Sequence, residues 1–235
     1  MKAGIIAAGE GSRLKAEGVS VPKPLVRVDG IPLIERMLNS YIRCGITEVS
    51  CIINEYSLSV RDFVQSKNFP IPINFHIETT PSSMHSFLAL EPYLNKGRFL
   101  LSTVDSIFDE GDLKRFLRYA ETHPQTDGVL AVTDFIDDEK PLYVQMAEDS
   151  RIIRFGKDGA NEPPWWVTGG LYIFSPKVYS EKARVLAQGM QQLRNFLSHL
   201  LESGYRIDAF PFSKIIDVDH ESDIRAAELH LRAQP

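Results

Sequence analysis

The sequence GIIAAGEGSRL (residues 4–14) is followed, after a polar gap, by VPKPLVRVDGIPL (residues 21–33). The opening apolar run breaks at Gly9 and Gly11, which is typical of a buried parallel strand followed by a loop that approaches a ligand. Glycines let backbone N–H groups come close to phosphate oxygens because no Cβ stands in the way. Arg13 adds a planar fork of donors suited to phosphate. This stretch therefore predicts a strand of a parallel sheet that opens into an anion-binding loop.

A second cation, Lys23, stands between Pro22 and Pro24. Two prolines restrict the backbone on both sides of the lysine, and a stiff lysine near a glycine-rich loop indicates phosphoryl or nucleotidyl chemistry. The loop is not a dinucleotide-binding fingerprint, because Leu14 occupies the place of the third glycine, and it lacks the Gly-Lys-Ser/Thr ending of a P-loop. Many Gly-x-Gly turns bind nothing, so the spacing alone leaves a structural turn as the alternative.

Taken as one string, GxGSRL followed by PKPLVxVxGxPLIER closely resembles the signature of the sugar-1-phosphate nucleotidyltransferases (NDP-sugar pyrophosphorylases) of the nucleotidyltransferase superfamily. The resemblance covers residues 9–36, and weaker similarities continue to the C-terminus. It implies Mg²⁺ as cofactor, and an NTP and a phosphorylated small-molecule acceptor as partners. It also implies that Arg13 and Lys23 are catalytic. The nucleotide-binding residues that it implies in this stretch are Ala8, Gly9, Gly11, Ser12, Arg13 and Lys23.

The composition is that of an ordinary globular protein. The 235 residues are 43% hydrophobic and 24% charged, which fits one α/β domain or two small ones. The net charge of −5 and the lack of a basic block argue against a nucleic-acid partner. Cys44 and Cys51 match no metal pattern and form no disulfide framework, as expected of a cytoplasmic protein. No apolar run approaches a membrane span, and the N-terminus makes a poor signal peptide.

Strands and helices alternate along the first half, which predicts an α/β fold with a mostly parallel sheet covered by helices on both faces. The expected helices are 31–44 closed by Gly45, 58–65 capped by Ser57, 84–94, 112–119, a segment from 176, 191–202 and 220–231. The expected strands are 48–53, 73–77, 98–104, 128–133, 167–174, 205–212 and 215–218, with a hairpin at 142–147 and 151–155.

The resemblance makes this sheet Rossmann-like, of the GT-A type, with a small antiparallel acceptor-binding portion. We expect one nucleotidyltransferase domain over residues 1–235. Its nucleotide-binding half is 1–134 and its acceptor-binding half is 135–235. An oligomer is possible, and the sequence does not fix its size.

Three aspartates are candidate ligands of Mg²⁺, which favours oxygen ligands. Asp105 closes an apolar strand, and ligands of parallel sheets bind beyond the carboxyl ends of strands, where residues 9–13 also fall. In IIDVDHESD (residues 215–223) the resemblance implies Asp217 as the second ligand, with Asp219 in reserve. The alternatives are that Asp105 is a turn or capping aspartate, that Asp219 caps the last helix, and that Asp217 is solvated. We expect His220 at the surface rather than acting as a base.

Residues 78–86, ETTPSSMHS, stand where the family recognises the base. Pro81 keeps the family's proline, and Pro81 and Ser83 are the nucleotide-binding candidates of this segment. Ser83, Met84 and His85 depart from the usual Gly-Thr-Ala. The serines and the following Phe-x-Leu also resemble phosphocholine cytidylyltransferases of the same superfamily. The alternative is a polar helix start.

WVTGGLYIFSP (residues 166–176) resembles the strand that lines the family's sugar pocket, with Gly170 as the best match. Lys157 stands one place before the family's sugar-phosphate lysine, so it binds the acceptor or is a solvated loop lysine. Trp165 and Trp166 could stack on a substrate ring or simply pack.

Together with these residues, the resemblance implies transfer of a nucleotidyl group from an NTP to a sugar 1-phosphate, with release of pyrophosphate. Arg13 and the amides of residues 9–12 would hold the β- and γ-phosphates, and Lys23 the α-phosphate region. Two alternatives stay open. One is a cytidylyltransferase for phosphocholine or a similar phospho-alcohol, and the other is a non-catalytic nucleotide-sensing protein on the same fold.

Overall fold

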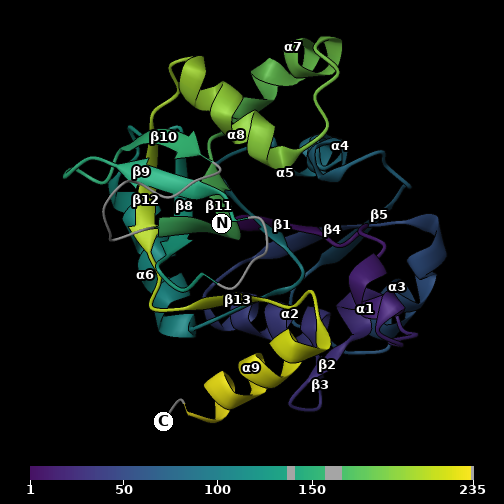
Figure 1. Ribbon diagram of the computed structural model, residues 1–235. Coiled ribbons are helices and arrows are strands. Elements are labelled where there is room, and N and C mark those ends of the chain that lie inside the picture. Colours follow the sequence, from purple (N-terminus) through teal and green to yellow (C-terminus); the bar gives the residue numbers. More distant parts are fainter. Residues whose placement is uncertain (137–140, 157–165, 234–235) are drawn as a thin grey trace.

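A mixed β-sheet of nine strands runs through the computed structural model, which describes residues 1–136, 141–156 and 166–233 (Figure 1). Its strands are β1 (Lys2–Ile6), β4 (Glu48–Ile53), β5 (Ile73–Ile77), β6 (Phe99–Thr103), β8 (Gly128–Thr133), β9 (Tyr143–Met146), β10 (Ile152–Gly156), β11 (Trp166–Phe174) and β12 (Ile207–Pro211). Two short pairs lie outside it, β2 (Arg27–Val28) with β3 (Ile31–Pro32) and β7 (Ser106–Phe108) with β13 (Ile215–Asp217).

The order β5-β4-β1-β6 is parallel throughout and forms the Rossmann-like half of the sheet. β11 follows β6 in antiparallel orientation, β8 lies antiparallel to β11, and β12 lies parallel to β8. The hairpin of β9 and β10 joins the start of β11. The predicted α/β fold is therefore confirmed. The antiparallel strands are part of the same sheet, so strands from both sides of residue 134 pair with one another.

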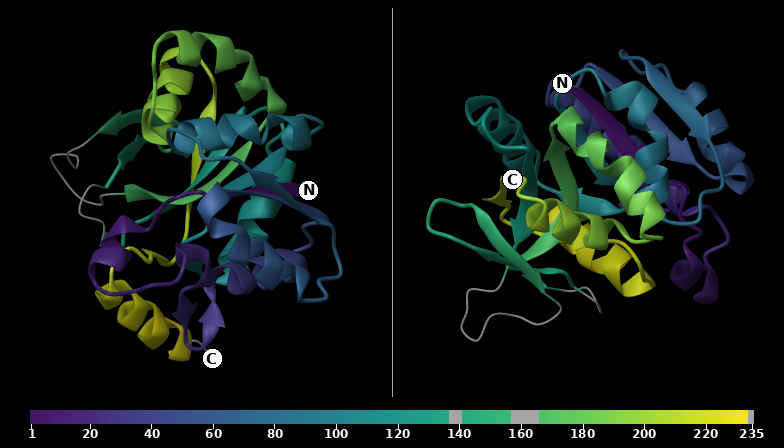
Figure 2. Two further views of the ribbon diagram at one scale, coloured as in Figure 1. Left: turned by 90° about the vertical axis from the view of Figure 1, so that its right-hand side faces the viewer. Right: turned by 90° about the horizontal axis from the view of Figure 1, so that it is seen from above.

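Helices cover both faces of the sheet (Figures 1 and 2). The α-helices of the described residues are α1 (Ser12–Ala16), α2 (Leu33–Arg43), α3 (Leu58–Gln65), α4 (Ser83–Ala89), α5 (Glu91–Leu94), α6 (Glu110–Thr122), α7 (Lys182–Ala187), α8 (Leu193–Glu202) and α9 (Glu221–Arg232). Short 3-10 helices are η1 (Lys23–Leu25), η2 (Glu55–Ser57) and η3 (Pro176–Glu181). α2, α3 and α6 pack on one face, and α4, α5, α7 and α8 pack on the other. Among the described residues, no helix is both long and apolar enough to cross a membrane.

The alternation of β1 explains why two cores form. Ala3 and Ile5 belong to the core under α2, α3 and α6, whereas Ile6 belongs to the core under α4, α5 and α8. Gly4 faces the second core, where an added Cβ would lie 2.7 Å from Leu94 Cδ1. The missing side chain at Gly4 thus allows α5 to pack directly on the strand.

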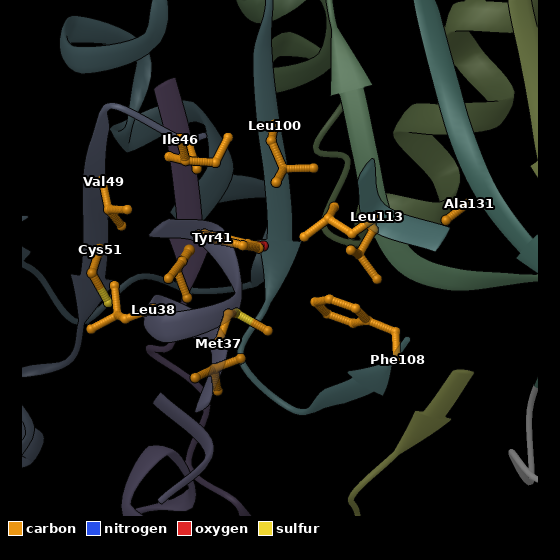
Figure 3. Packing of buried hydrophobic residues seen from close by; sticks show 14 of the residues in the cluster. Met37, Leu38, Tyr41, Ile46, Val49, Cys51, Leu100, Phe108, Leu113 and Ala131 are labelled. Atoms are coloured by element: carbon orange, nitrogen blue, oxygen red, sulfur yellow. The ribbon is translucent and has the colours of Figure 1, made fainter. Parts of the chain in front are cut away.

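Figure 3 shows the first core, where Met37, Leu38 and Tyr41 of α2 lie beside β4 and β6. The buried Tyr41 hydroxyl donates to Ser102 Oγ at 2.6 Å, so its polar atom is satisfied. The second core is aromatic and has Phe87 at its centre. The ring of Phe87 stacks on one neighbouring ring and packs against three others within 6.3 Å, namely Tyr179, Phe196, Phe174 and Phe99.

Most element boundaries agree with the sequence pattern, and the differences have local causes. The helix predicted at 84–94 is wrong as a single element, because α4 ends at Ala89 and a separate helix, α5, begins at Glu91 with Pro92 in its first turn. Pro92 has no N–H for the helical ladder. The helix predicted from residue 31 begins at Leu33. Ser57 precedes α3, but its side chain makes no capping bond; Asn54 Oδ1 accepts from the Tyr56 N–H at the start of η2.

We predict that Phe87→Ala lowers the free energy of unfolding by about 3–5 kcal/mol, because the cavity would open among the packed rings. Tyr56→Ala is the matched control, since the Tyr56 side chain is 84% exposed, and should change stability by less than about 0.5 kcal/mol. Denaturant unfolding followed by circular dichroism measures both. A loss of under about 1 kcal/mol for Phe87→Ala would contradict this description of the core.

Candidate active site

The glycine-rich loop and Asp105 meet at one edge of the sheet. β1 and β6 are parallel neighbours with Ile6 opposite Thr103, so the segments that follow the two strands leave the sheet together. Asn54, which follows β4, lies at the same edge and donates from Nδ2 to the Ala8 carbonyl at 3.1 Å. The structure therefore brings residues 9–13 and Asp105 together as the argument from strand ends expected, and it adds Asn54, which that argument did not include.

The loop after β1 adopts the backbone that its glycines allow. Gly11 precedes α1 with φ +60°. This left-handed backbone conformation is unfavourable for residues that carry a Cβ and is readily adopted by glycine. A Cβ at Gly11 would lie 3.1 Å from Lys23 Cβ, so the loop packs against the lysine. Nothing lies within 4 Å of a Cβ built on Gly9, which leaves that part of the loop open.

A cavity of about 360 Å³ opens over this loop. Most of the residues predicted to bind nucleotide line its wall, namely Gly9, Gly11, Ser12, Arg13, Lys23 and Ser83. Asp105 and Asp219 also line it. Ala8 and Pro81, predicted with them, are absent from its wall. The Ala8 carbonyl instead accepts the hydrogen bond from Asn54, which holds the loop to β4.

Lys23 is largely buried and bridges two carboxylates. Its side chain is 10% exposed, and its Nζ donates to Asp105 Oδ2 and to Asp219 Oδ1, each at 2.5 Å. Burial alone would lower the pKa of Lys23, but Asp105 and Asp219 outweigh it and raise that pKa above its ordinary value. Lys23 is therefore charged at any physiological pH. Arg13 Nη1 donates to Asp219 Oδ2 at 2.5 Å, so Asp219 joins both cations.

The geometry excludes the capping alternative for Asp219. His220 is the N-cap residue of α9, and the Asp223 side chain accepts from the Asp219 and His220 N–H groups at 2.9 and 2.7 Å. His220, expected at the surface, is partly buried, and its Nδ1 lies 2.6 Å from Glu17 Oε1. This contact links the end of α1 to the start of α9.

Asp217 is not solvated either. It ends β13, and its Oδ1 accepts from Ser106 Oγ at 2.8 Å. Burial and then the negative charge of Asp105 raise the pKa of Asp217 to about 7. Asp105 is also buried, which favours its neutral form, but the Lys23 ammonium holds the pKa of this carboxyl below its usual value.

The donor set of Asp105 and Asp217 fits Mg²⁺. Asp105 Oδ1 is buried without a hydrogen-bond partner among the described residues, and the charge of Asp217 is disfavoured by its neighbour. A divalent cation would relieve both. In residues 1–136, 141–156 and 166–233 no three His, Cys, Asp or Glu side chains are grouped to hold a metal. Mg²⁺ suits such a site, because it is usually bound by one or two carboxylates together with waters and substrate phosphates.

A second cavity, also of about 360 Å³, shares Ser83, Thr103 and Asp105 with the first. Gly170, predicted for the acceptor, lines it together with Asp217. The lining residues that the sequence analysis missed include Tyr172, Gln192, Leu193 and Arg194. No sequence signal indicated that Gln192 and Arg194 border a cavity, because the hydrophobic pattern of α8 identifies only its core-facing residues. Lys157 and Trp165 lie outside the described residues, and Trp166 packs partly against the second core.

Gly170 has φ +73° and sits in the interruption of the pairing of β11 with β8 between Thr168 and Tyr172. A Cβ there would lie 2.6 Å from Ser106 Oγ and 2.7 Å from Thr103 Oγ1. The glycine thus allows the backbone of β11 to pass close to the hydroxyl that holds Asp217.

Comparison with known proteins gives the class. The chain belongs to the nucleotidyl transferase family, because the sequence model of that family matches residues 2–233. It is similar to the mannose-1-phosphate guanyltransferase beta-B of Xenopus laevis, with 31% identity over an alignment of 186 residues. This alignment covers 76% of this chain and 51% of that protein. It is also similar to the UTP–glucose-1-phosphate uridylyltransferase AglF of Haloferax volcanii, with 24% identity over an alignment of 242 residues. This alignment covers 100% of this chain and 98% of that protein.

Thus the chain spans about half the length of the first of these relatives and nearly all of the second. Among solved structures, the inositol-1-phosphate CTP transferase from T. maritima has the same fold, with a TM-score of 0.82 and 22% identity. The alignment covers 98% of this chain and 95% of that one.

We predict that Gly170→Ala destabilises the protein more than Gly189→Ala. Gly189 has a similar φ of +64° but open space around its Cβ, so its substitution should cost only the left-handed backbone, about 1–2 kcal/mol. Gly170→Ala adds the clash with Ser106 and Thr103, on the order of 1–3 kcal/mol more. Thermal and denaturant unfolding measure the difference. Equal costs would show that the approach of β11 to Ser106 is not tight.

Proposed function

We propose that the protein transfers a nucleotidyl group from an NTP to a phosphorylated small molecule, with a sugar 1-phosphate as the acceptor. One observation carries the proposal: two cavities of similar size meet at Asp105, and Lys23 lies in the wall of the first beside that carboxylate. Two substrates bound in these cavities would present their phosphates to each other at the shared wall. Membership of the nucleotidyl transferase family supports the same reaction.

In this proposal the NTP occupies the first cavity. The open backbone at Gly9, the N–H groups of residues 9–12 and the Arg13 guanidinium would bind the β- and γ-phosphates. Lys23 would act at the α-phosphate, where charge builds as the bond to pyrophosphate breaks. Because the lysine is already charged and fixed between prolines, it needs no reorganisation to stabilise that charge.

The acceptor occupies the second cavity and approaches over Gly170. Its phosphate oxygen attacks the α-phosphorus in line, and pyrophosphate leaves. The nucleophile is already an anion, so the reaction needs no general base, and positioning with charge neutralisation supplies the catalysis. Asp105 and Asp217 would hold Mg²⁺, which when bound would neutralise phosphate charge and help align the two substrates.

Arg194 gives the second cavity a cation for the acceptor phosphate. It lies at the start of α8, and the buried Tyr172, which lines the same cavity, is close enough to Arg194, Asp217 and Asp105 for their charges to act on the pKa of its hydroxyl. An arginine that lines one cavity with two carboxylates suits a phosphate whose other oxygens bind a metal. Lys157, which the resemblance assigns to the same phosphate, would be a second ligand.

The second candidate function keeps the reaction and changes the acceptor to phosphocholine or a similar phospho-alcohol, with CTP as donor. The serine-rich segment that suggested it lies at the site, because Ser83 lines both cavities and accepts from the Leu193 N–H at 3.4 Å. A nucleotide-sensing role without turnover is the third possibility.

Pyrophosphate release separates the three. The protein is incubated with each of the common NTPs, Mg²⁺ and either glucose 1-phosphate, mannose 1-phosphate or phosphocholine. Release with a sugar 1-phosphate supports the main proposal, and release with CTP and phosphocholine alone supports the second candidate. Nucleotide binding without release from any combination would overturn both.

We predict that Lys23→Ala lowers kcat by on the order of 10²–10³, because one well-placed donor to the transition state is lost. The substitution also leaves Asp105 without its counter-ion, which should cost about 3–5 kcal/mol of stability, so rates are compared below the lowered thermal midpoint. Lys23→Arg keeps the charge and should recover little of kcat, since the guanidinium is wider and the prolines restrict adjustment. Lys67→Ala, at an exposed pair with Glu35, is the control. A near-normal kcat in a folded Lys23→Ala protein would sink the mechanism.

We predict that Arg194→Ala raises the KM for the acceptor by on the order of 10- to 100-fold while the Kd for the NTP stays within about twofold. Arg184→Ala is matched to it, since Arg184 is an exposed arginine on the neighbouring helix α7 that pairs with Glu181. Steady-state kinetics and calorimetry measure the two constants. A larger effect on NTP binding than on the acceptor would place Arg194 in the nucleotide site instead.

A further inference from the structure

Asp219 binds both cations that the proposed function gives to the triphosphate. Its Oδ1 accepts from Lys23 Nζ and its Oδ2 from Arg13 Nη1, each at 2.5 Å. All three side chains line the first cavity. The two oxygens of one carboxylate thus occupy donors that phosphate oxygens would use, since carboxylates and phosphates bind ammonium and guanidinium groups in the same way.

The backbone around Asp219 is fixed, whereas its side chain borders open space. The Asp219 N–H donates to Asp223 Oδ2 at 2.9 Å, and the preceding Val218 N–H donates to the Asp105 carbonyl at 3.1 Å. The side chain is 34% exposed, compared with 18% for Asp105. A change of side-chain rotamer can therefore release the carboxylate without moving the chain.

Lys23 keeps a partner if Asp219 departs. Lys23 Nζ also donates to Asp105 Oδ2, and Asp105, which follows β6, is the more buried of the two carboxylates. The ammonium would thus stay in place beside Asp105 while one of its donors becomes available. Asp105 positions the lysine, and Asp219 is the anion that can be exchanged.

We propose that Asp219 is an internal competitor of the NTP: it occupies Arg13 and Lys23 in the free protein, and the triphosphate displaces it. The inference rests on the proposed nucleotide site. The exchange holds the two cations at the cavity wall before substrate arrives, and it weakens the binding of any phosphate that cannot replace both contacts. Asp219 is a positioning residue in this account, because it acts through Arg13 and Lys23.

The test measures binding of inorganic tripolyphosphate, which carries the charges of the NTP without a base or a sugar. Calorimetry is done in EDTA, so that a metal held by Asp219 cannot contribute, for wild type, Asp219→Asn and Asp219→Ala. Glu221→Gln is the control, because it removes the same charge two residues away from a side chain whose ion pair is with Arg225. Circular dichroism of each variant checks that it is folded.

Both Asp219 variants should bind tripolyphosphate on the order of tenfold more tightly than wild type, as expected when an ionic competitor is removed. Glu221→Gln should change the Kd by less than about twofold. In an Arg13→Gln background the gain from Asp219→Asn should shrink, because one of the two contested donors is gone. Unchanged or weaker binding by the folded Asp219 variants would overturn the proposal. The outcome is independent of turnover, since pyrophosphate release by the wild type tests the proposed function separately.

Discussion

The ion pair of Lys23 with Asp105 is the interaction around which the site is arranged. Two buried opposite charges are stable only when each compensates the other's desolvation, so neither residue can be removed alone without cost. The pair joins η1, which follows the glycine-rich loop, to the end of β6, which is far away in the sequence. Gly11 packs on the same lysine. The anion loop, the lysine and the candidate metal carboxylate are thereby held in one arrangement before a substrate arrives.

The sheet explains why the second half of the chain contributes to the same site. β11 lies between β6 and β8, and β13 pairs with β7 directly after Asp105. This pairing sets Asp217 opposite Ser106. The walls of both cavities therefore take residues from both sides of residue 134.

The sequence was sufficient where one short pattern determines the outcome. An apolar run ending in glycines defines β1 and its loop, and strand ends in a parallel sheet meet at one edge, so Gly9, Arg13 and Asp105 could be placed together in advance. The partners of Asp219 could not, because they depend on how the predicted strand at 215–218 pairs with β7, which the sequence pattern did not predict. Arg194 was missed for another reason: the hydrophobic pattern of α8 identifies its core face and says nothing of the residues at its first turn. Pro92 could have predicted the break between α4 and α5, because proline is common in the first turn of a helix and disfavoured in its interior.

The walls of the second cavity differ in how freely they can be changed. Gly170 and Asp217 belong to β11 and β13, and their positions are fixed by neighbouring strands and by Ser106. At the start of α8, Gln192 is exposed and Arg194 is half-buried, whereas Leu193 between them belongs to the second core. Under the proposed function, acceptor preference could thus diverge through substitutions at these two positions while Gly170 and Asp217 stay constant. For redesign of the proposed acceptor site, Gln192 and Arg194 are therefore the positions to vary first, because neither belongs to the sheet.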